Sequence, residues 1–301
     1  MSNTAISVSD LSKKYDDRLA VSHINFEVPL GTVCGFVGPN GSGKTTTMRM
    51  LLGLISPTTG KGHILDQPIE HPEKYLSRVG AMIEGPAFYP ALSGQENLMV
   101  LAKLCGFPTD RVQSLLEKVG LGDRAKSKYK TYSLGMKQRL GIAAALLPQP
   151  KLLMLDEPTN GLDPEGIQEV RALLRDLANQ GTTVFVSSHL LSELEIISDY
   201  IVMLRKGEIV FAGLIGDLMR KQQPTIIAKS LLHSDLARIL EIAENSGHLA
   251  IIRDDAVHIL AQIDWAPVLN KAAFAAGITL AQLSPQLPNL EETFFEMTGD
   301  K

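Results

Sequence analysis

Residues 38 to 45, GPNGSGKT, constrain the possible folds of this chain more than any other segment. They satisfy the pattern G-x-x-x-x-G-K-[ST] at every fixed position, and the glycines let successive backbone N–H groups turn inward around phosphate oxygens. The apolar run Val33 to Val37 predicts a buried strand before this loop, and apolar residues at helical spacing predict a helix from Thr45 to Leu54 after it. Because strand, loop and helix follow in this order, the sequence predicts an α/β domain with a phosphate-binding loop.

The side chains of this loop suit a nucleoside triphosphate. Lys44 would neutralise the β and γ phosphates, Thr45 offers a hydroxyl to Mg²⁺, and the following helix adds the positive end of its dipole. Such loops serve kinases, small GTPases, helicases and transport motors alike, so other motifs have to separate these classes. The residues expected to contact the nucleotide here are Gly38, Pro39, Asn40, Gly41, Ser42, Gly43, Lys44, Thr45 and Thr46.

An acidic pair, Asp156 and Glu157, follows the apolar run Leu152 to Leu155. Uncompensated charge at the tip of a buried strand is costly, and a magnesium ion would compensate it. In that arrangement Asp156 would hold the hydration shell of the metal, while Glu157 would accept a proton from the attacking water. The pair therefore predicts hydrolysis of the bound nucleotide.

Two further stretches indicate how the chain is organised. Apolar and polar residues alternate over the first thirty positions, which predicts short antiparallel strands with one face in water. Residues from about 86 to 150 predict a helical insert, in which Ser93 and Glu96 form a capping box before one helix and Thr109 opens another. Beyond the insert, buried strands alternate with helices, which predicts a parallel core sheet.

The chain of 301 residues is long enough for two domains, since a domain takes roughly 100 to 200 residues. Residues 1–220 carry the alternation of strands and helices around the phosphate-binding loop. Residues 221–301 show shorter strands and three helices, which predicts a small α+β accessory domain.

Bulk composition excludes several classes of protein. A net charge of −4 gives no reason to expect a nucleic-acid partner. Two cysteines, Cys34 and Cys105, are too few for a disulfide framework and indicate a reducing compartment. No uninterrupted apolar stretch approaches the roughly 18 to 20 residues of a membrane-spanning helix. Any path through a membrane is therefore expected to lie in separate subunits.

Taken in order, the motifs of residues 3 to 215 resemble the nucleotide-binding subunit of an ATP-binding cassette (ABC) transporter of the ABC-2 exporter type. The resemblance implies an α/β fold: a P-loop NTPase cassette with a mixed core sheet, an antiparallel β subdomain and a helical insert. The small C-terminal α+β appendix would follow it. The resemblance also implies that the nucleotide is ATP and that Mg²⁺ is the cofactor.

The segment Tyr132 to Met136, YSLGM, is similar to the LSGGQ signature of this family. The resemblance implies that Ser133 and Gly135 contact the γ-phosphate of ATP held by a second copy of the subunit. A hydroxyl, a backbone without a side chain and a helix start all suit an anion. Leu134 and Met136 depart from the commonest letters, and taken alone the segment also fits a simple capped amphipathic helix.

Three more positions follow from the resemblance. Asp163, in the loop Asn160 to Asp163, would lie on the dimer seam and help to fix the partner's site, and it also suits the N-cap of its own helix. His189 matches the switch histidine that contacts the γ-phosphate and orients the water beside Glu157. Tyr15 occupies the position at which the family stacks an aromatic ring on adenine, a contact worth roughly 1 to 3 kcal/mol.

Glu84 departs from the family pattern, in which most members have glutamine in the loop that meets Mg²⁺ and the membrane partner. A carboxylate binds the metal more strongly than an amide, which makes Glu84 a predicted ligand beside Thr45 and Asp156. This glutamate, followed by Phe88-Tyr89-Pro90, resembles the branch that includes bacitracin-export and lantibiotic self-immunity transporters. A side chain that only faces solvent is the alternative.

The resemblance implies an ATP-hydrolysing subunit that powers export through separate transmembrane permease subunits. It would act as a dimer, bound peripherally to the cytoplasmic face of the cell membrane. An antimicrobial peptide, a drug or a lipid would be the exported substrate, which is contacted by the permease. There are two alternatives: an importer ATPase subunit, or a soluble ABC ATPase acting on DNA or ribosomes. Soluble ABC ATPases of that kind usually carry coiled-coil, zinc-finger or tandem-cassette features.

Overall fold

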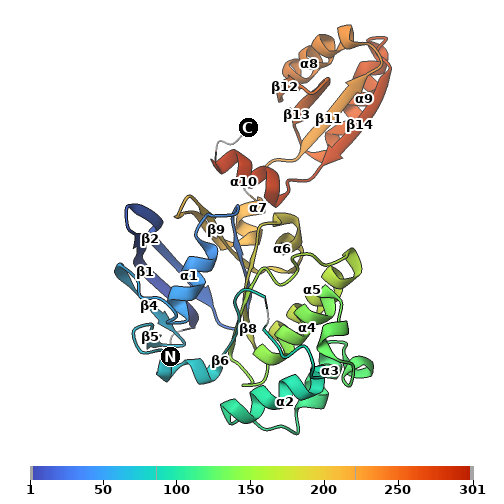
Figure 1. Ribbon diagram of the computed structural model, residues 1–301. Helices are drawn as coiled ribbons and strands as arrows, with labels where there is room; N and C mark the ends of the chain where they lie inside the picture. The colour runs from blue at the N-terminus through green and yellow to red at the C-terminus, as the bar shows by residue number, and fades with distance from the viewer. Residues whose placement is uncertain (1–2, 86, 221, 299–301) are drawn as a thin grey trace. The chain divides into compact units, whose positions relative to one another are not determined.

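The computed structural model describes residues 3–85, 87–220 and 222–298, and it divides the chain into two compact units, Met1–Ile215 and Gly216–Lys301 (Figure 1). The division falls where strand β10 (Glu208–Leu214) gives way to helix α7 (Ile215–Arg220). The predicted start of the helical insert, Pro86, and of the accessory domain, Lys221, lie outside the described residues.

The first unit contains an antiparallel sheet in the order β2-β1-β4-β5. Its strands are β1 (Thr4–Tyr15), β2 (Arg18–Pro29), β4 (Thr59–Ile64) and β5 (Gln67–Pro68). The prediction of short strands at the N-terminus was wrong, because β1 and β2 have 12 residues each. Register shifts interrupt their pairing, for example between Val8 and Leu11, and such bulges break the alternation of side chains without ending the strand.

The second sheet of this unit is mixed, in the order β10-β9-β3-β8-β7-β6. Five strands are parallel and only β10 runs against its neighbour β9, as the predicted mixed core sheet requires. Every residue of the strands β3, β7 and β8 is buried, including the polar residues at the ends of β7 and β8, as is usual for the central strands of a parallel sheet. The strands other than β10 are β3 (Val33–Val37), β6 (Val79–Met82), β7 (Leu152–Asp156), β8 (Thr183–Ser188) and β9 (Tyr200–Arg205).

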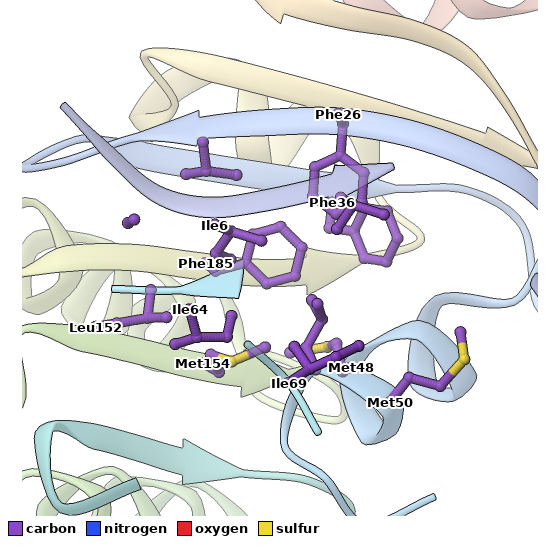
Figure 2. Close-up of a cluster of buried hydrophobic side chains, with 14 of the residues drawn as sticks. Ile6, Phe26, Phe36, Met48, Met50, Ile64, Ile69, Leu152, Met154 and Phe185 are labelled. Atoms are coloured by element: carbon purple, nitrogen blue, oxygen red, sulfur yellow. The ribbon is translucent and has the colours of Figure 1, made fainter. Parts of the chain in front are cut away.

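Helix α1 (Lys44–Leu51) is held in a core shared by both sheets. Figure 2 shows Met48 of this helix near Ile64 of the antiparallel sheet and Met154 of the parallel one. Phe26, Phe36 and Phe185 stack in the same cluster, with ring centroids 5.0 to 6.1 Å apart. The helix ends before the predicted Leu54, because Gly53 adopts a φ of 68° that glycine tolerates and a helix does not.

The insert contains α2 (Gly94–Cys105), α3 (Val112–Lys118) and α4 (Leu134–Ala145). The capping box is present: the Ser93 Oγ accepts from the Glu96 N–H, and the Glu96 carboxylate accepts from the Ser93 N–H. The Ser93 N–H and the Ser93 Oγ both donate to the Glu96 carboxylate, and these hydrogen bonds lower the pKa of Glu96. Thr109 does not open α3 as predicted, because its carbonyl accepts from the Val112 N–H in a turn that precedes the helix.

Two more helices complete the first unit, α5 (Pro164–Asn179) after β7 and α6 (Leu191–Ile197) after β8. Both pack against strands of the parallel sheet. Each strand-to-helix connection therefore lies at the carboxyl edge of this sheet, where neighbouring parallel strands bring their following loops together.

The second unit has the chain order β-α-β-β-α-β and a sheet in the order β12-β13-β11-β14. Helices α8 and α9 share a single core with the strands, which includes Ile226, Ile239, Val257 and Leu269. The fold is α+β, as predicted. Its elements are β11 (Thr225–Ser230), α8 (Leu236–Asn245), β12 (Leu249–Arg253), β13 (Ala256–Leu260), α9 (Ala266–Ala275), β14 (Leu280–Gln286) and α10 (Leu290–Thr298).

Candidate nucleotide site

The glycine-rich loop connects β3 to α1, and its backbone leaves no room for side chains at two positions. A Cβ at Gly38 would lie 2.2 Å from the Leu204 carbonyl oxygen, and one at Gly43 would lie 2.7 Å from that of Ala20. Gly43 also has a φ of 110°. Glycine is therefore required by the fold around this loop as well as by an approaching phosphate.

Lys44 begins α1 and points back into the loop. Its Nζ donates to the carbonyl oxygens of Gly38 at 2.6 Å and Pro39 at 3.4 Å. It also lies 3.3 Å from the Glu157 Oε1, although only 6% of the side chain is exposed. The cation is thus held where the loop would present it to an anion.

An open cavity of about 480 Å³ adjoins the loop. Its lining brings Tyr15, Lys44 and Thr45 together and also includes Glu157. Arg18 and Ala20 were not anticipated, although a basic residue close to Tyr15 was a usable signal. The lining residues are Tyr15, Arg18, Ala20, Asn40, Gly41, Gly43, Lys44, Thr45, Thr46 and Glu157.

Asp156, at the end of β7, is buried and receives two hydrogen bonds. Its Oδ2 accepts from the Thr45 Oγ1 at 2.7 Å, and its Oδ1 accepts from the Ser187 Oγ at 2.5 Å. Two of the three predicted metal ligands therefore lie in direct contact. Ser187 was missed, although a hydroxyl at the carboxyl end of an apolar strand is a visible signal.

Glu157 links Lys44 of the loop to His189. Its backbone has a φ of 49° and its N–H donates to the Ser187 Oγ at 2.9 Å. One carboxylate oxygen faces Lys44, and the other lies 2.8 Å from the His189 Nδ1 and 3.3 Å from the His189 backbone N. Glu157 thus contacts both Lys44 and His189, an arrangement suited to proton transfer and to anion binding.

Glu84 is not brought to the pair of Thr45 and Asp156. It follows β6 with a φ of 63°, and its exposed carboxylate forms an ion pair with Arg49 of α1. The predicted metal-ligand set is therefore only partly assembled among the described residues. Arg49 was missed because an arginine on a helix has no local signal of a partner in a distant loop.

Ser133 and Gly135 lie at the start of α4, outside the residues that line the cavity. The Ser133 Oγ caps the helix by accepting from the Met136 N–H at 3.3 Å. Tyr132, just before it, is buried and donates to the Arg124 carbonyl at 2.8 Å, and burial raises the pKa of its phenol. The helix start is thus anchored on one side and exposed at Ser133.

Asp163 caps α5 by accepting from the Gly166 N–H at 3.1 Å. It too lies outside the cavity lining. The loop before it touches the start of α4, since a Cβ at Gly161 would lie 2.5 Å from the Leu134 Cδ2. The three residues predicted to act on a partner's nucleotide therefore lie on two adjoining segments of this chain, away from its own cavity.

Comparisons with known proteins agree with this geometry. A family model described as ABC transporter matches residues 21–160. The chain is 38% identical over 301 residues to the bacitracin transport ATP-binding protein BcrA of Bacillus licheniformis, covering 99% of this chain and 98% of that protein. It is 43% identical over 205 residues to the lantibiotic transport ATP-binding protein SrtF of Streptococcus pyogenes, covering 68% and 89%.

Solved structures show the same fold. An ATP-binding subunit of an ABC transporter is 30% identical with a TM-score of 0.65, covering 72% of this chain and 93% of that one. The ATP-binding cassette MJ0796, a dimer bound to ADP and phosphate after hydrolysis, is 24% identical with a TM-score of 0.63, covering 70% and 98%. No helix among the described residues is long and apolar enough to cross a membrane. The chain belongs to the ATP-binding proteins of ABC transporters and is an ATP-hydrolysing subunit of that family.

Proposed function

We propose that two copies of this chain enclose two ATP molecules, each between the loop 38–46 of one copy and Ser133 and Gly135 of the other. One observation carries this proposal: the exposed Ser133 and the half-buried Gly135 form a helix start that lies outside the cavity of their own chain. A helix start with a serine hydroxyl at its N-cap and a glycine two positions later suits a phosphate of a nucleotide held elsewhere.

The residues around Asp156 fit a magnesium ion. The Thr45 hydroxyl and the Asp156 carboxylate are hard oxygen donors 2.7 Å apart, beside the cavity, and Mg²⁺ prefers such donors together with phosphate oxygens. When bound, the ion would neutralise charge on the β and γ phosphates. Glu84 would join this set only by leaving Arg49.

The contacts of Glu157 suggest how the chain itself hydrolyses ATP. Triphosphate entering the cavity would draw Lys44 toward its phosphates and away from Glu157. Glu157 would then accept the proton of the attacking water, while His189, already bonded to the same carboxylate, orients that water and the γ-phosphate. Tyr15 would stack on the adenine at the open side of the cavity.

We further assign residues 1–220 to ATP binding and residues 221–301 to an accessory domain. The names of the bacitracin and lantibiotic relatives support a role in exporting an antimicrobial peptide, a drug or a lipid. The subunit would sit peripherally on the cytoplasmic face of the membrane, where permease subunits dock beside Glu84 and the helical insert. Nucleic acid is not an expected partner.

Coexpression with the membrane proteins encoded by neighbouring genes tests this function. We expect the chain to copurify with them and to confer export or resistance that requires ATP hydrolysis. Dependence on a periplasmic binding protein with uptake of substrate would instead indicate an importer. ATPase activity stimulated by DNA or ribosomes, without a copurifying membrane protein, would contradict the transport function.

Replacing Glu84 with glutamine is expected to leave ATP binding and stability intact while changing how hydrolysis couples to export. The ion pair with Arg49 is exposed, so its loss costs about 0 to 1 kcal/mol, whereas the amide is a weaker ligand for Mg²⁺. Fluorescent-nucleotide binding, thermal unfolding and export in cells at several Mg²⁺ concentrations measure the three effects. Unchanged export at every concentration would show that this glutamate is neutral.

A further inference from the structure

Glu193, on helix α6, is a buried carboxylate that the hydrolysis steps above do not use. Only 5% of the residue is exposed. Its Oε2 accepts a hydrogen bond of 2.6 Å from the Thr159 Oγ1. Burying a charged carboxylate is costly unless a partner compensates it, so Glu193 cannot be explained as an ordinary solvated acid on the surface.

The two bonded residues belong to the two segments that carry the predicted catalytic groups. Thr159 comes two positions after Glu157, in the loop that leads to Asp163 and α5. Glu193 comes four positions after His189, in the first turn of the helix that follows it. The hydrogen bond therefore ties the loop after β7 to the helix after β8.

The loop held by this bond is shaped by its own backbone. The Asn160 N–H donates to the Glu157 carbonyl at 3.2 Å, and the Leu162 N–H donates to the Thr159 carbonyl at 3.1 Å. These turns connect Glu157 to the residues that would face a partner. Thr159 lies between Glu157 and these residues, so its hydrogen bond to Glu193 helps to fix the position of both ends of the loop.

Building on the proposed dimer, we propose that Glu193 is a positioning residue that acts through Thr159. Contact of the Asn160 to Asp163 loop with the second copy is transmitted through the Thr159–Glu193 bond to α6 and His189. The bond thus keeps the base, the switch histidine and the seam loop in one arrangement, and it makes hydrolysis at one site depend on closure of the dimer.

Thr159→Val and Thr159→Ser form a matched pair of tests. Valine has the shape of threonine but no hydroxyl, whereas serine keeps the hydroxyl and loses only a methyl group. We expect Thr159→Val to lower kcat by about tenfold or more and to bring the Hill coefficient for ATP toward 1, because small misplacements of catalytic groups are costly. We expect Thr159→Ser to restore both values and the Kd of the isolated chain for ATP to stay unchanged.

Glu193→Gln supplies a second measurement if the valine variant folds poorly. Its amide oxygen still accepts from Thr159, so the cooperativity should persist in Glu193→Gln and fall in Glu193→Ala. Wild-type kcat and Hill coefficient in Thr159→Val would overturn the inference. The inference would also be overturned if the losses of kcat and cooperativity in Thr159→Val and Thr159→Ser tracked the thermal unfolding temperatures of these variants and not the presence of the hydroxyl. If the unmodified chain forms no ATP-dependent dimer, the proposed function fails first, which separates the two failures.

Discussion

Replacing Glu157 with glutamine is expected to stop ATP turnover while ATP binding persists and a closed dimer accumulates. The substitution keeps the size of the side chain and its contact with His189 but removes the group that accepts the proton of water. Loss of a general base lowers rates by about 100- to 10,000-fold. The same change removes a negative charge 3.3 Å from the Lys44 Nζ, which leaves the lysine free for the phosphates.

Phosphate release measures the rate, and size-exclusion chromatography with and without ATP measures the dimer. Glu165→Gln is a matched control, since Glu165 is an exposed glutamate in the first turn of α5 and lies outside the cavity lining. Near-normal hydrolysis by the Glu157 variant would remove this residue from the role of base. A dimer that forms equally without ATP would contradict the nucleotide sandwich.

Replacing Gly135 with aspartate is expected to abolish hydrolysis without affecting ATP binding by the isolated chain. In the proposed dimer this residue faces the γ-phosphate held by the other copy, and opposing negative charges there cost several kcal/mol, or about a hundredfold or more in rate. The site within one chain is untouched, because Gly135 does not line the cavity.

Gly135→Ala separates charge from bulk. A Cβ at this position would lie 3.5 Å from the nearest atom outside its immediate neighbours, the Leu162 Cδ2, so the fold accommodates it. We expect the alanine variant to fold normally and to keep more activity than the aspartate variant.

Mixing the Gly135→Asp variant with a Lys44→Ala variant provides a stringent measurement. One composite site of the mixed dimer carries both changes, and the other carries neither. Hydrolysis that reappears in the mixture supports sites shared between copies, whereas full activity of the aspartate variant alone contradicts them.

Much of the fold could be predicted from local patterns. The buried strands before Gly38 and Asp156 and the capping box at Ser93 and Glu96 depend on neighbouring residues, so the structure confirmed them. Predictions failed where a local pattern has two structural solutions. The bulges in β1 look like strand ends in sequence, and the turn at Thr109 looks like the first turn of a helix.

The contacts within the site also divide into those that motifs predict and those that they do not. Thr45 and Asp156 are separated by 111 positions, yet their contact could be anticipated because each belongs to a recognisable motif. Arg49 and Glu84 are 35 positions apart, and Thr159 and Glu193 are 34 apart, with no motif to pair them. The contact of Thr159 with Glu193 arises from the order of strands in the sheet, which places the segments after β7 and β8 side by side.

By itself, the sequence determined which chemical groups are present: a phosphate-binding loop, the acidic pair Asp156 and Glu157, a histidine and a signature-like helix start. Each of these groups is recognised from short spacings along the chain, and such spacings do not depend on the conformation. Only the tertiary structure decided which of these groups share one cavity. It placed Lys44 and Glu157 in the cavity lining with His189 in contact with Glu157, paired Glu84 with Arg49, and left Ser133 and Gly135 outside the lining. The physical reason is that parallel strands bring their carboxyl ends to one edge, while the insert carries its helix start away from it.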